Sequence, residues 1–248
     1  MYQFFIRSCQ ATAHEVTIMG DDVNHIKNVL RMRQGDVIAA IDQESGTEYR
    51  CEIDTFEEGE VKCRLLFVKE NGIELPSRVY LFQGLPKNDK MELIIQKAVE
   101  LGVYKIIPLA SKRAVVKLDA KKEAGKLARW NAISEAAAKQ SKRRIVPEVT
   151  GVMTIREAVD FCEDFEVKLI PYELADQEAM ADTKQIIDHL QPGQSIAIFI
   201  GPEGGFEESE VEQAAAAGFQ PITLGRRILR TETAGFTVLA WIMYHLER

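Results

Sequence analysis

Residues 195–206 read SIAIFIGPEGGF, an apolar run that leads directly into a glycine-rich turn. A short run of apolar residues that ends at turn signals predicts a buried strand over 195–200. The turn that follows contains neither the Lys-Ser/Thr pair of a phosphate loop nor a GxGxxG dinucleotide pattern. On spacing alone, this turn is either a tight connection to a helix predicted at 207–218, or a place where bare main chain approaches a ligand.

Strands alternate with helices on both sides of this stretch. Besides 195–200, the pattern predicts strands at 78–83, 103–109, 167–171 and 221–225, and an amphipathic helix at 88–102. That alternation is typical of a parallel sheet with helices on its faces. Ligands of such sheets bind beyond the carboxyl ends of the strands, where both the turn at 201–205 and the turn beginning at 224 are expected.

The N-terminal part of the chain has a different pattern of predicted elements. Short strands are predicted at 2–7, 36–42, 48–54 and 61–68, with one helix at 21–33 that places Val23, Ile26, Val29 and Leu30 on one face. These elements suit a small β-barrel with one helix. A polar connection that contains glycine and proline follows at 69–76. We therefore expect two domains, at 1–72 and 73–248.

Composition narrows the class of protein. No apolar run approaches the ~20 residues that a membrane-spanning helix needs, and the first ten residues lack the pattern of a signal peptide. We therefore expect a cytoplasmic protein with no membrane partner. The four cysteines and four histidines show no CxxC, HxxxH or HxH spacing, so we expect no metal.

The net charge of −7 hides a segregation of charge along the chain. Residues 105–147 contain 12 Lys or Arg against 3 Asp or Glu, whereas residues 148–218 contain 3 against 16. A basic segment in an acidic protein indicates a surface for a polyanion, and a solvated helix face is the alternative.

Five motifs lie between residues 97 and 234: KAVELGV at 97–103, EAAAKQSKRRIVPEV at 135–149, PYE at 171–173, IGPEGGF at 200–206 and LGRRILRTETA at 224–234. Together they closely resemble the bacterial 16S ribosomal RNA uracil-N3 methyltransferases, the small-subunit methyltransferase E family of the SPOUT superfamily. The resemblance covers nearly the whole chain. It implies an α/β fold, in which a SPOUT-type parallel sheet with a C-terminal trefoil knot follows a small PUA-like β-barrel that binds RNA.

The resemblance also implies the function. The family transfers a methyl group from S-adenosylmethionine to uracil N3 of a specific uridine of 16S rRNA, in the 30S ribosomal subunit, and works as a homodimer. The apolar final segment, 231–248, agrees with a partner chain, and we expect an interface near Phe236, Leu239 and Tyr244. The competing hypothesis is a non-catalytic RNA-binding ribosome assembly factor that has kept the fold, although the intact glycine loops disfavour it.

Carried over motif by motif, the resemblance assigns the methyl donor to three loops. They are the loop at PYEL, residues 171–174, and the two glycine loops that begin at 201 and 224. The expected donor-binding residues are Leu174, Ile200, Gly201, Glu203, Gly204, Leu224, Gly225, Ile228, Leu229 and Arg230. Arg230 and Glu232 are the catalytic candidates, because a cation or a carboxylate beside the uracil imide helps to remove its proton or stabilise the anion. A salt bridge within the knot is the alternative for each.

RNA contacts are expected from the basic segment and the barrel. The candidates are Arg31, Arg33, Lys87, Arg113, Gln140, Arg143 and Arg144. Arginine suits this task because its guanidinium group can donate to two phosphate oxygens at once.

Overall fold

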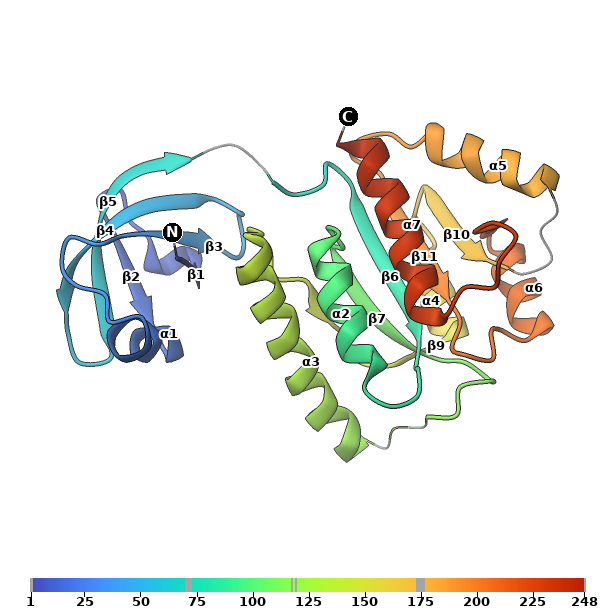
Figure 1. Cartoon of the computed structure of the whole chain (residues 1–248), viewed down its shortest axis with the longest axis horizontal. Helices are drawn as coiled ribbons and strands as arrows, with labels where there is room; N and C mark the ends of the chain where they lie inside the picture. Colours follow the sequence, from blue (N-terminus) through green and yellow to red (C-terminus); the bar gives the residue numbers. More distant parts are fainter. Residues whose placement is uncertain (1, 70–72, 117, 119, 173–176, 248) are drawn as a thin grey trace. The chain divides into compact units, whose positions relative to one another are not determined.

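The computed structural model of the chain describes residues 2–69, 73–116, 118, 120–172 and 177–247, with the elements labelled in Figure 1. It forms two compact units. Unit 1 consists of residues 1–74 together with 138–146, and unit 2 consists of 75–137 and 147–248. The first unit therefore includes a short segment from the middle of the chain in addition to the N-terminal region.

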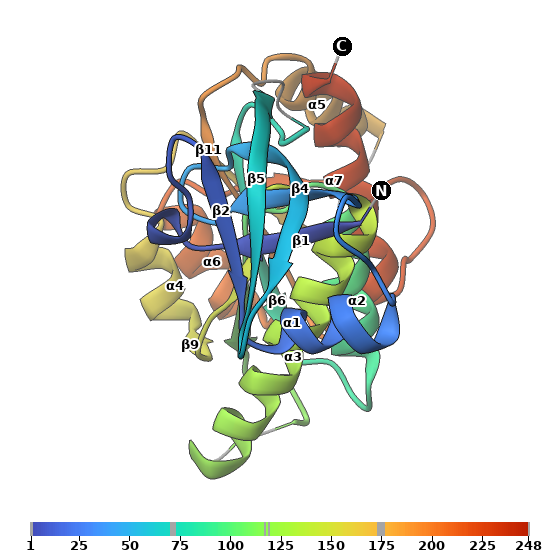
Figure 2. The ribbon, with the colours of Figure 1, turned by 90° about the vertical axis from the view of Figure 1, so that its left-hand side faces the viewer.

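Unit 1 is built on a five-stranded sheet in the order β1-β3-β4-β5-β2 (Figure 2). Its elements are β1 (Gln3–Ile6), a 3-10 turn (Ser8–Gln10), β2 (Glu15–Met19), α1 (Asp21–Asn24), a π-helical turn (His25–Val29), β3 (Val37–Asp42), β4 (Glu48–Phe56) and β5 (Glu60–Lys69). β1 and β3 pair in parallel, and the remaining pairs are antiparallel. The sheet curls around a core that includes Ile6, Ile18, Ile38 and Ile53, as in the half-barrel of a PUA-like domain.

The predicted helix at 21–33 is wrong in its extent. α1 ends at Asn24 and passes into a π-helical turn, in which the Leu30 amide donates to the His25 carbonyl. The wider turn carries Val29 away from the buried face, so Ile26 is fully buried while Val29 is 63% exposed. Arg31 then adopts a left-handed conformation, with φ of 51°, and ends the helical segment.

β2 was not predicted, because its five residues acquire their role from pairing. The strand alternates buried and exposed residues and pairs with β5, with Val16 opposite Cys63. Nothing within 15–19 distinguishes such a short edge segment from a loop until its partner strand is known.

A half-buried carboxylate, that of Glu74, holds the two segments of unit 1 together. Glu74 accepts hydrogen bonds from the Arg143 guanidinium Nε, at 2.9 Å, and from the backbone amides of Arg144 and Ile145, at 2.7 and 3.1 Å. The Arg144 guanidinium donates to Glu48, at 3.3 Å. Both arginines are only 5% exposed, so their charges depend on these carboxylates.

Replacing Glu74 tests this anchoring. We expect Glu74→Gln to destabilise unit 1 by about 3–5 kcal/mol, because it removes the carboxylate charge that pairs with the buried Arg143 guanidinium group. The free energy of unfolding is measured in urea, with hydrogen exchange of peptides from β3, β4 and β5 reporting on unit 1.

The matched control is Glu52→Gln. Glu52 pairs with Arg64 at 3.2 Å, but the side chain of Arg64 is 62% exposed. Loss of such a surface pair should cost less than about 1 kcal/mol. Equal losses in the two variants would contradict the anchoring role of Glu74.

Unit 2 is built on a seven-stranded parallel sheet, which agrees with the predicted strand and helix alternation. Six strands follow the order β12-β10-β11-β6-β7-β8, and β9 also pairs with β7. The strands are β6 (Arg78–Gly84), β7 (Lys105–Ala110), β8 (Glu148–Val149), β9 (Met153–Thr154), β10 (Val167–Pro171), β11 (Ser195–Ile200) and β12 (Gln220–Ile222). The helices are α2 (Lys90–Glu100), α3 (Ala120–Ser141, whose last four residues belong to unit 1), α4 (Ile155–Phe161), α5 (Gln177–Asp188), α6 (Glu208–Ala216) and α7 (Thr231–Leu246).

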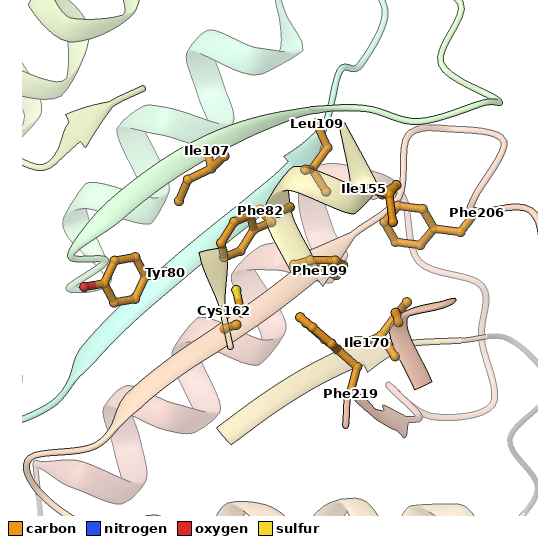
Figure 3. Close-up of a cluster of buried hydrophobic side chains, with 13 residues drawn as sticks. Tyr80, Phe82, Ile107, Leu109, Ile155, Cys162, Ile170, Phe199, Phe206 and Phe219 are labelled. Carbon is orange, nitrogen blue, oxygen red and sulfur yellow. The ribbon is translucent and has the colours of Figure 1, made fainter. Parts of the chain in front are cut away.

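Helices cover both faces of this sheet. On one face, α4 and α6 pack over an aromatic cluster in which the rings of Phe82 and Phe199 lie 4.8 Å apart (Figure 3). On the other face, α2 and α7 pack against each other, and α7 packs on β6 and β11. Because successive side chains of a strand point to opposite faces of the sheet, Leu81 and Ile198 are buried on this second face. Among the helices of the described residues, none has the length and apolar character that crossing a membrane requires.

Candidate functional site

A cavity of about 540 Å³ lies in unit 2, beyond the carboxyl ends of β10, β11 and β12. Two segments form most of its wall: residues 200–206, after β11, and residues 223–231, between β12 and α7. Lys90, Arg113, Pro171, Tyr172 and Ala234 complete the lining. The cavity therefore occupies the edge of the sheet where ligands of parallel sheets bind.

The glycines of the first loop allow close packing of the backbone. A Cβ atom on Gly201 would lie 3.0 Å from the Cα of Gly205, and one on Gly84 would lie 2.6 Å from the amide nitrogen of Pro202. Gly205 has a φ of +67°, which favours glycine. Bare backbone is thus needed at 201 and 84 for the loop to fold against itself and against the end of β6.

The second loop also turns at a glycine. Gly225 has a φ of +104°, and a Cβ atom there would meet no protein atom within 4 Å. The Gly225 amide donates to the Thr223 hydroxyl, and the Thr223 amide donates to the Thr183 hydroxyl of α5, at 3.0 Å. Because the chain turns here, β12 ends at Ile222 and the strand predicted at 221–225 is shorter than expected.

A chain of hydrogen bonds joins both loops to the sheet beneath the cavity. The Thr231 hydroxyl donates to the Gly201 carbonyl, at 2.6 Å, and accepts from the Gln83 side-chain amide, at 2.8 Å. Gln83 is fully buried, and Thr231 is 6% exposed. The first residue of α7 is therefore attached to the first loop and to the end of β6.

A second link is ionic. The ammonium group of Lys90 lies 3.2 Å from the carboxylate of Glu203 and 3.3 Å from that of Glu232. Burial raises the pKa of Glu203, but hydrogen bonds from its own amide, from Lys90 and from the Lys87 amide outweigh it and lower the pKa below its ordinary value. The same hydrogen bond with Glu203 raises the pKa of Lys90. Both groups therefore stay charged at neutral pH.

Most sequence-predicted donor residues line the cavity. They are Ile200, Gly201, Glu203, Gly204, Leu224, Gly225, Ile228, Leu229 and Arg230. Leu174 lies outside the described residues. The structure thus brings together two loops that are about twenty residues apart in the sequence, because they follow β11 and β12, the strands on either side of β10.

The two catalytic candidates differ in position. Arg230 is exposed, lines the cavity and precedes the first residue of α7. Glu232 is not among the lining residues, and its carboxylate pairs with Lys90. Lys90 itself was missed by the sequence reasoning. It lies in the first turn of α2, and no motif in the sequence indicates that it pairs with Glu203 in the first loop and Glu232 in α7.

The RNA-binding candidates are distributed over both units. In unit 2, Lys87 and Arg113 are exposed, and Arg113 donates to the Gly204 carbonyl, at 3.1 Å. In unit 1, the exposed candidates are Arg31, Arg33 and Gln140. The buried ion pairs of Arg143 and Arg144 support a structural role, and their burial leaves the prediction that they bind RNA without support.

Metal ligands do not gather in the part of the chain that the structure describes. Among those residues, no group of three or more His, Cys, Asp or Glu side chains has an arrangement suited to a metal ion.

Two family models match the chain. One describes an RNA methyltransferase domain and matches residues 73–243, and the other describes an RNA methyltransferase PUA domain and matches residues 18–66. The ribosomal RNA small subunit methyltransferase E of Bacillus subtilis is 39% identical over 100% of this chain and 98% of its own length. Both compact units therefore have counterparts in known proteins.

Solved structures with the same architecture contain a bound ligand. The ribosomal RNA small subunit methyltransferase E of Neisseria gonorrhoeae, bound to S-adenosyl methionine, is 33% identical, with a TM-score of 0.84 over 98% of this chain and 97% of its own. A methyltransferase of Legionella pneumophila in complex with the same cofactor is 30% identical, with a TM-score of 0.83 over 98% of this chain and 97% of its own.

The hydroxyl of Thr231 provides a test of how the two loops are held. Thr231→Val should destabilise unit 2 by about 1–3 kcal/mol, because the Gly201 carbonyl loses its donor and the buried Gln83 amide loses an acceptor. Thr231→Ser keeps the hydroxyl group and should retain most of the stability. Thermal unfolding of both variants measures the difference, and equal stability of the valine and serine variants would rule out the link.

Proposed function

Because the chain belongs to the ribosomal RNA small subunit methyltransferase E family of RNA methyltransferases, we propose that it transfers a methyl group from S-adenosylmethionine to uracil N3 of a specific uridine in 16S rRNA. The observation that carries this proposal is the cavity at the carboxyl ends of the strands, walled by the two glycine loops. We propose the small ribosomal subunit as the substrate particle, and therefore the cytoplasm as the place of action.

The cavity fits the proposed methyl donor. Its volume of about 540 Å³ is within the range of about 300–1,000 Å³ that is usual for sites of small ligands. Main-chain groups of both loops can recognise the edge of an adenine ring, while Ile228 and Leu229 offer apolar contact to its faces. When bound, S-adenosylmethionine supplies the activated methyl group.

Arg230 is the proposed catalytic residue. Its exposed guanidinium group lines the cavity and has the charge to stabilise a uracil anion as N3 loses its proton. Glu232 acts as a positioning residue, because its contact with Lys90 holds the first turn of α7 next to Glu203. Orientation of the two reactants supplies much of the acceleration in a displacement at carbon.

RNA recognition is proposed for both units. Unit 1 matches the PUA model, which supports binding of RNA by its exposed Arg31 and Arg33. In unit 2, Lys87 and Arg113 are exposed near the first loop.

We further propose that the segment from β11 to α7 forms the trefoil knot implied by the family resemblance, since Thr231 binds the Gly201 carbonyl.

Donor binding and product analysis test the function. Calorimetry should detect binding of S-adenosylmethionine but not of ATP, and mass spectrometry should detect N3-methyluridine in 16S rRNA after incubation with unmodified small subunits. Arg230→Ala should retain most RNA affinity but slow single-turnover methylation at saturating donor by about 100-fold or more, as loss of a transition-state donor does. Donor binding without any methylated product would contradict the proposal, and binding of RNA alone would favour the non-catalytic assembly factor.

A homodimer is proposed from the outer face of α7. Gly235, Val238 and Ile242 are buried within unit 2, whereas Tyr244 is 65% exposed and Phe236 is half-buried. Leu239, expected at the interface, is instead fully buried in the core of its own unit. An exposed apolar face on a terminal helix supports contact with a second copy.

Sedimentation measures this association. The protein should sediment as a dimer at micromolar concentration, and Tyr244→Asp should shift it toward the monomer, because it places a charge in an apolar contact. Tyr2→Asp is the matched control, since Tyr2 is 52% exposed in unit 1. A monomeric wild-type protein would rule out the dimer.

A further inference from the structure

The cations that line the cavity fall into two groups. Lys90 is paired with Glu203 and Glu232, and Arg113 donates to the Gly204 carbonyl. Arg226, Arg227 and Arg230, by contrast, are exposed, and their guanidinium groups make no hydrogen bond or ion pair with any other described residue. The second group therefore has its donors available for a ligand.

The two adjacent arginines are held between fixed points. On one side, the Gly225 amide donates a hydrogen bond to the Thr223 hydroxyl, and the Thr223 amide donates one to the Thr183 hydroxyl. On the other side, Arg230 is the N-cap of α7, and its carbonyl accepts a hydrogen bond from the Ala234 amide, at 2.8 Å. Adjacent guanidinium groups on so short a segment repel each other. An anion bound between them removes that repulsion.

Nothing else in the described lining neutralises them. Among the described residues that line the cavity, Glu203 is the only one with an acidic side chain, and Lys90 already pairs with it. Guanidinium groups donate to two oxygens of one phosphate, so a pair of them suits a phosphodiester group better than an isolated ammonium group does.

We propose that Arg226 and Arg227 form a phosphate clamp, which binds a phosphodiester group of the substrate RNA at the cavity and so holds the target nucleotide over the methyl donor. The clamp rests on the proposed function, because the phosphodiester belongs to the RNA that is methylated. Its role is separate from that of Arg230, which contacts the base. The carboxylate of the donor is the other anion that reaches this cavity, and the experiment distinguishes the two.

The test compares two double variants that lose the same charge. Arg226→Ala with Arg227→Ala removes the clamp, whereas Arg156→Ala with Lys184→Ala removes two exposed cations that lie on α4 and α5, away from the cavity lining. Affinity for unmodified small ribosomal subunits is measured across a salt series, and donor affinity is measured by calorimetry with S-adenosylmethionine.

The clamp variant should lose about tenfold in RNA affinity for each arginine. The magnitude of its log-log salt slope should fall by about 0.7–0.9 for each lost phosphate contact. Donor affinity should stay unchanged, which also shows that the cavity is intact. Arg226→Lys with Arg227→Lys should keep most of the salt slope but recover only part of the affinity, since the charge remains and the fork is lost.

Two results would overturn the clamp. One is an RNA affinity and salt slope equal to those of the Arg156/Lys184 control, which would make the arginines ordinary solvated charges. The other is a loss of donor affinity with normal RNA binding, which would assign them to the donor carboxylate. Failure of the proposed function looks different, because the wild-type protein would then bind subunits without methylating them while the clamp variant still weakened that binding.

Discussion

The hydroxyl group of Thr231 connects three parts of the chain that are far apart in sequence. It donates to the Gly201 carbonyl and accepts from the Gln83 amide, so the first loop, the start of α7 and the end of β6 share one buried contact. Both glycine loops depend on it, because the second loop ends where α7 begins. A cavity whose walls are mostly loop can keep a defined shape when its loops are bonded to a rigid sheet in this way.

Charge in this protein has two uses, which burial distinguishes. In unit 1, Arg143 and Arg144 are buried against Glu74 and Glu48, where each guanidinium group depends on its carboxylate. At the cavity, Arg226 and Arg227 are exposed and have no partner among the described residues. Both pairs occur as Arg-Arg in the sequence, yet the first stabilises a fold and the second is available to a ligand. The positive balance of residues 105–147 therefore includes two arginines whose charge is used within the fold.

The segment 138–146 changes how the front of the chain is understood. A boundary after residue 72 follows from the polar connection at 69–76, and it treats the barrel as an N-terminal domain complete in itself. In the structure, Glu74 binds the backbone of Arg144 and Ile145, and the compact unit includes both segments. The proposed RNA-binding unit thus includes the last four residues of α3 and the five residues that follow them.

Local patterns were sufficient to predict the parallel sheet, α2 with its buried face at Met91, Ile94 and Ile95, and the two glycine loops after strands, because strand and helix periods and turn residues act over short distances. The motifs further predicted nine of the residues with which these loops line the cavity, but not Arg226, Arg227 or Thr231. Tertiary structure alone decided the π-helical turn after Asn24, the pairing of β2 and the place of Lys90 between Glu203 and Glu232. It also decided that Arg143 is buried while Arg226 is exposed. Periodicity constrains which face of an element is apolar, but the partner of a charged side chain is set by contacts between residues distant in sequence, and these exist only in the folded chain.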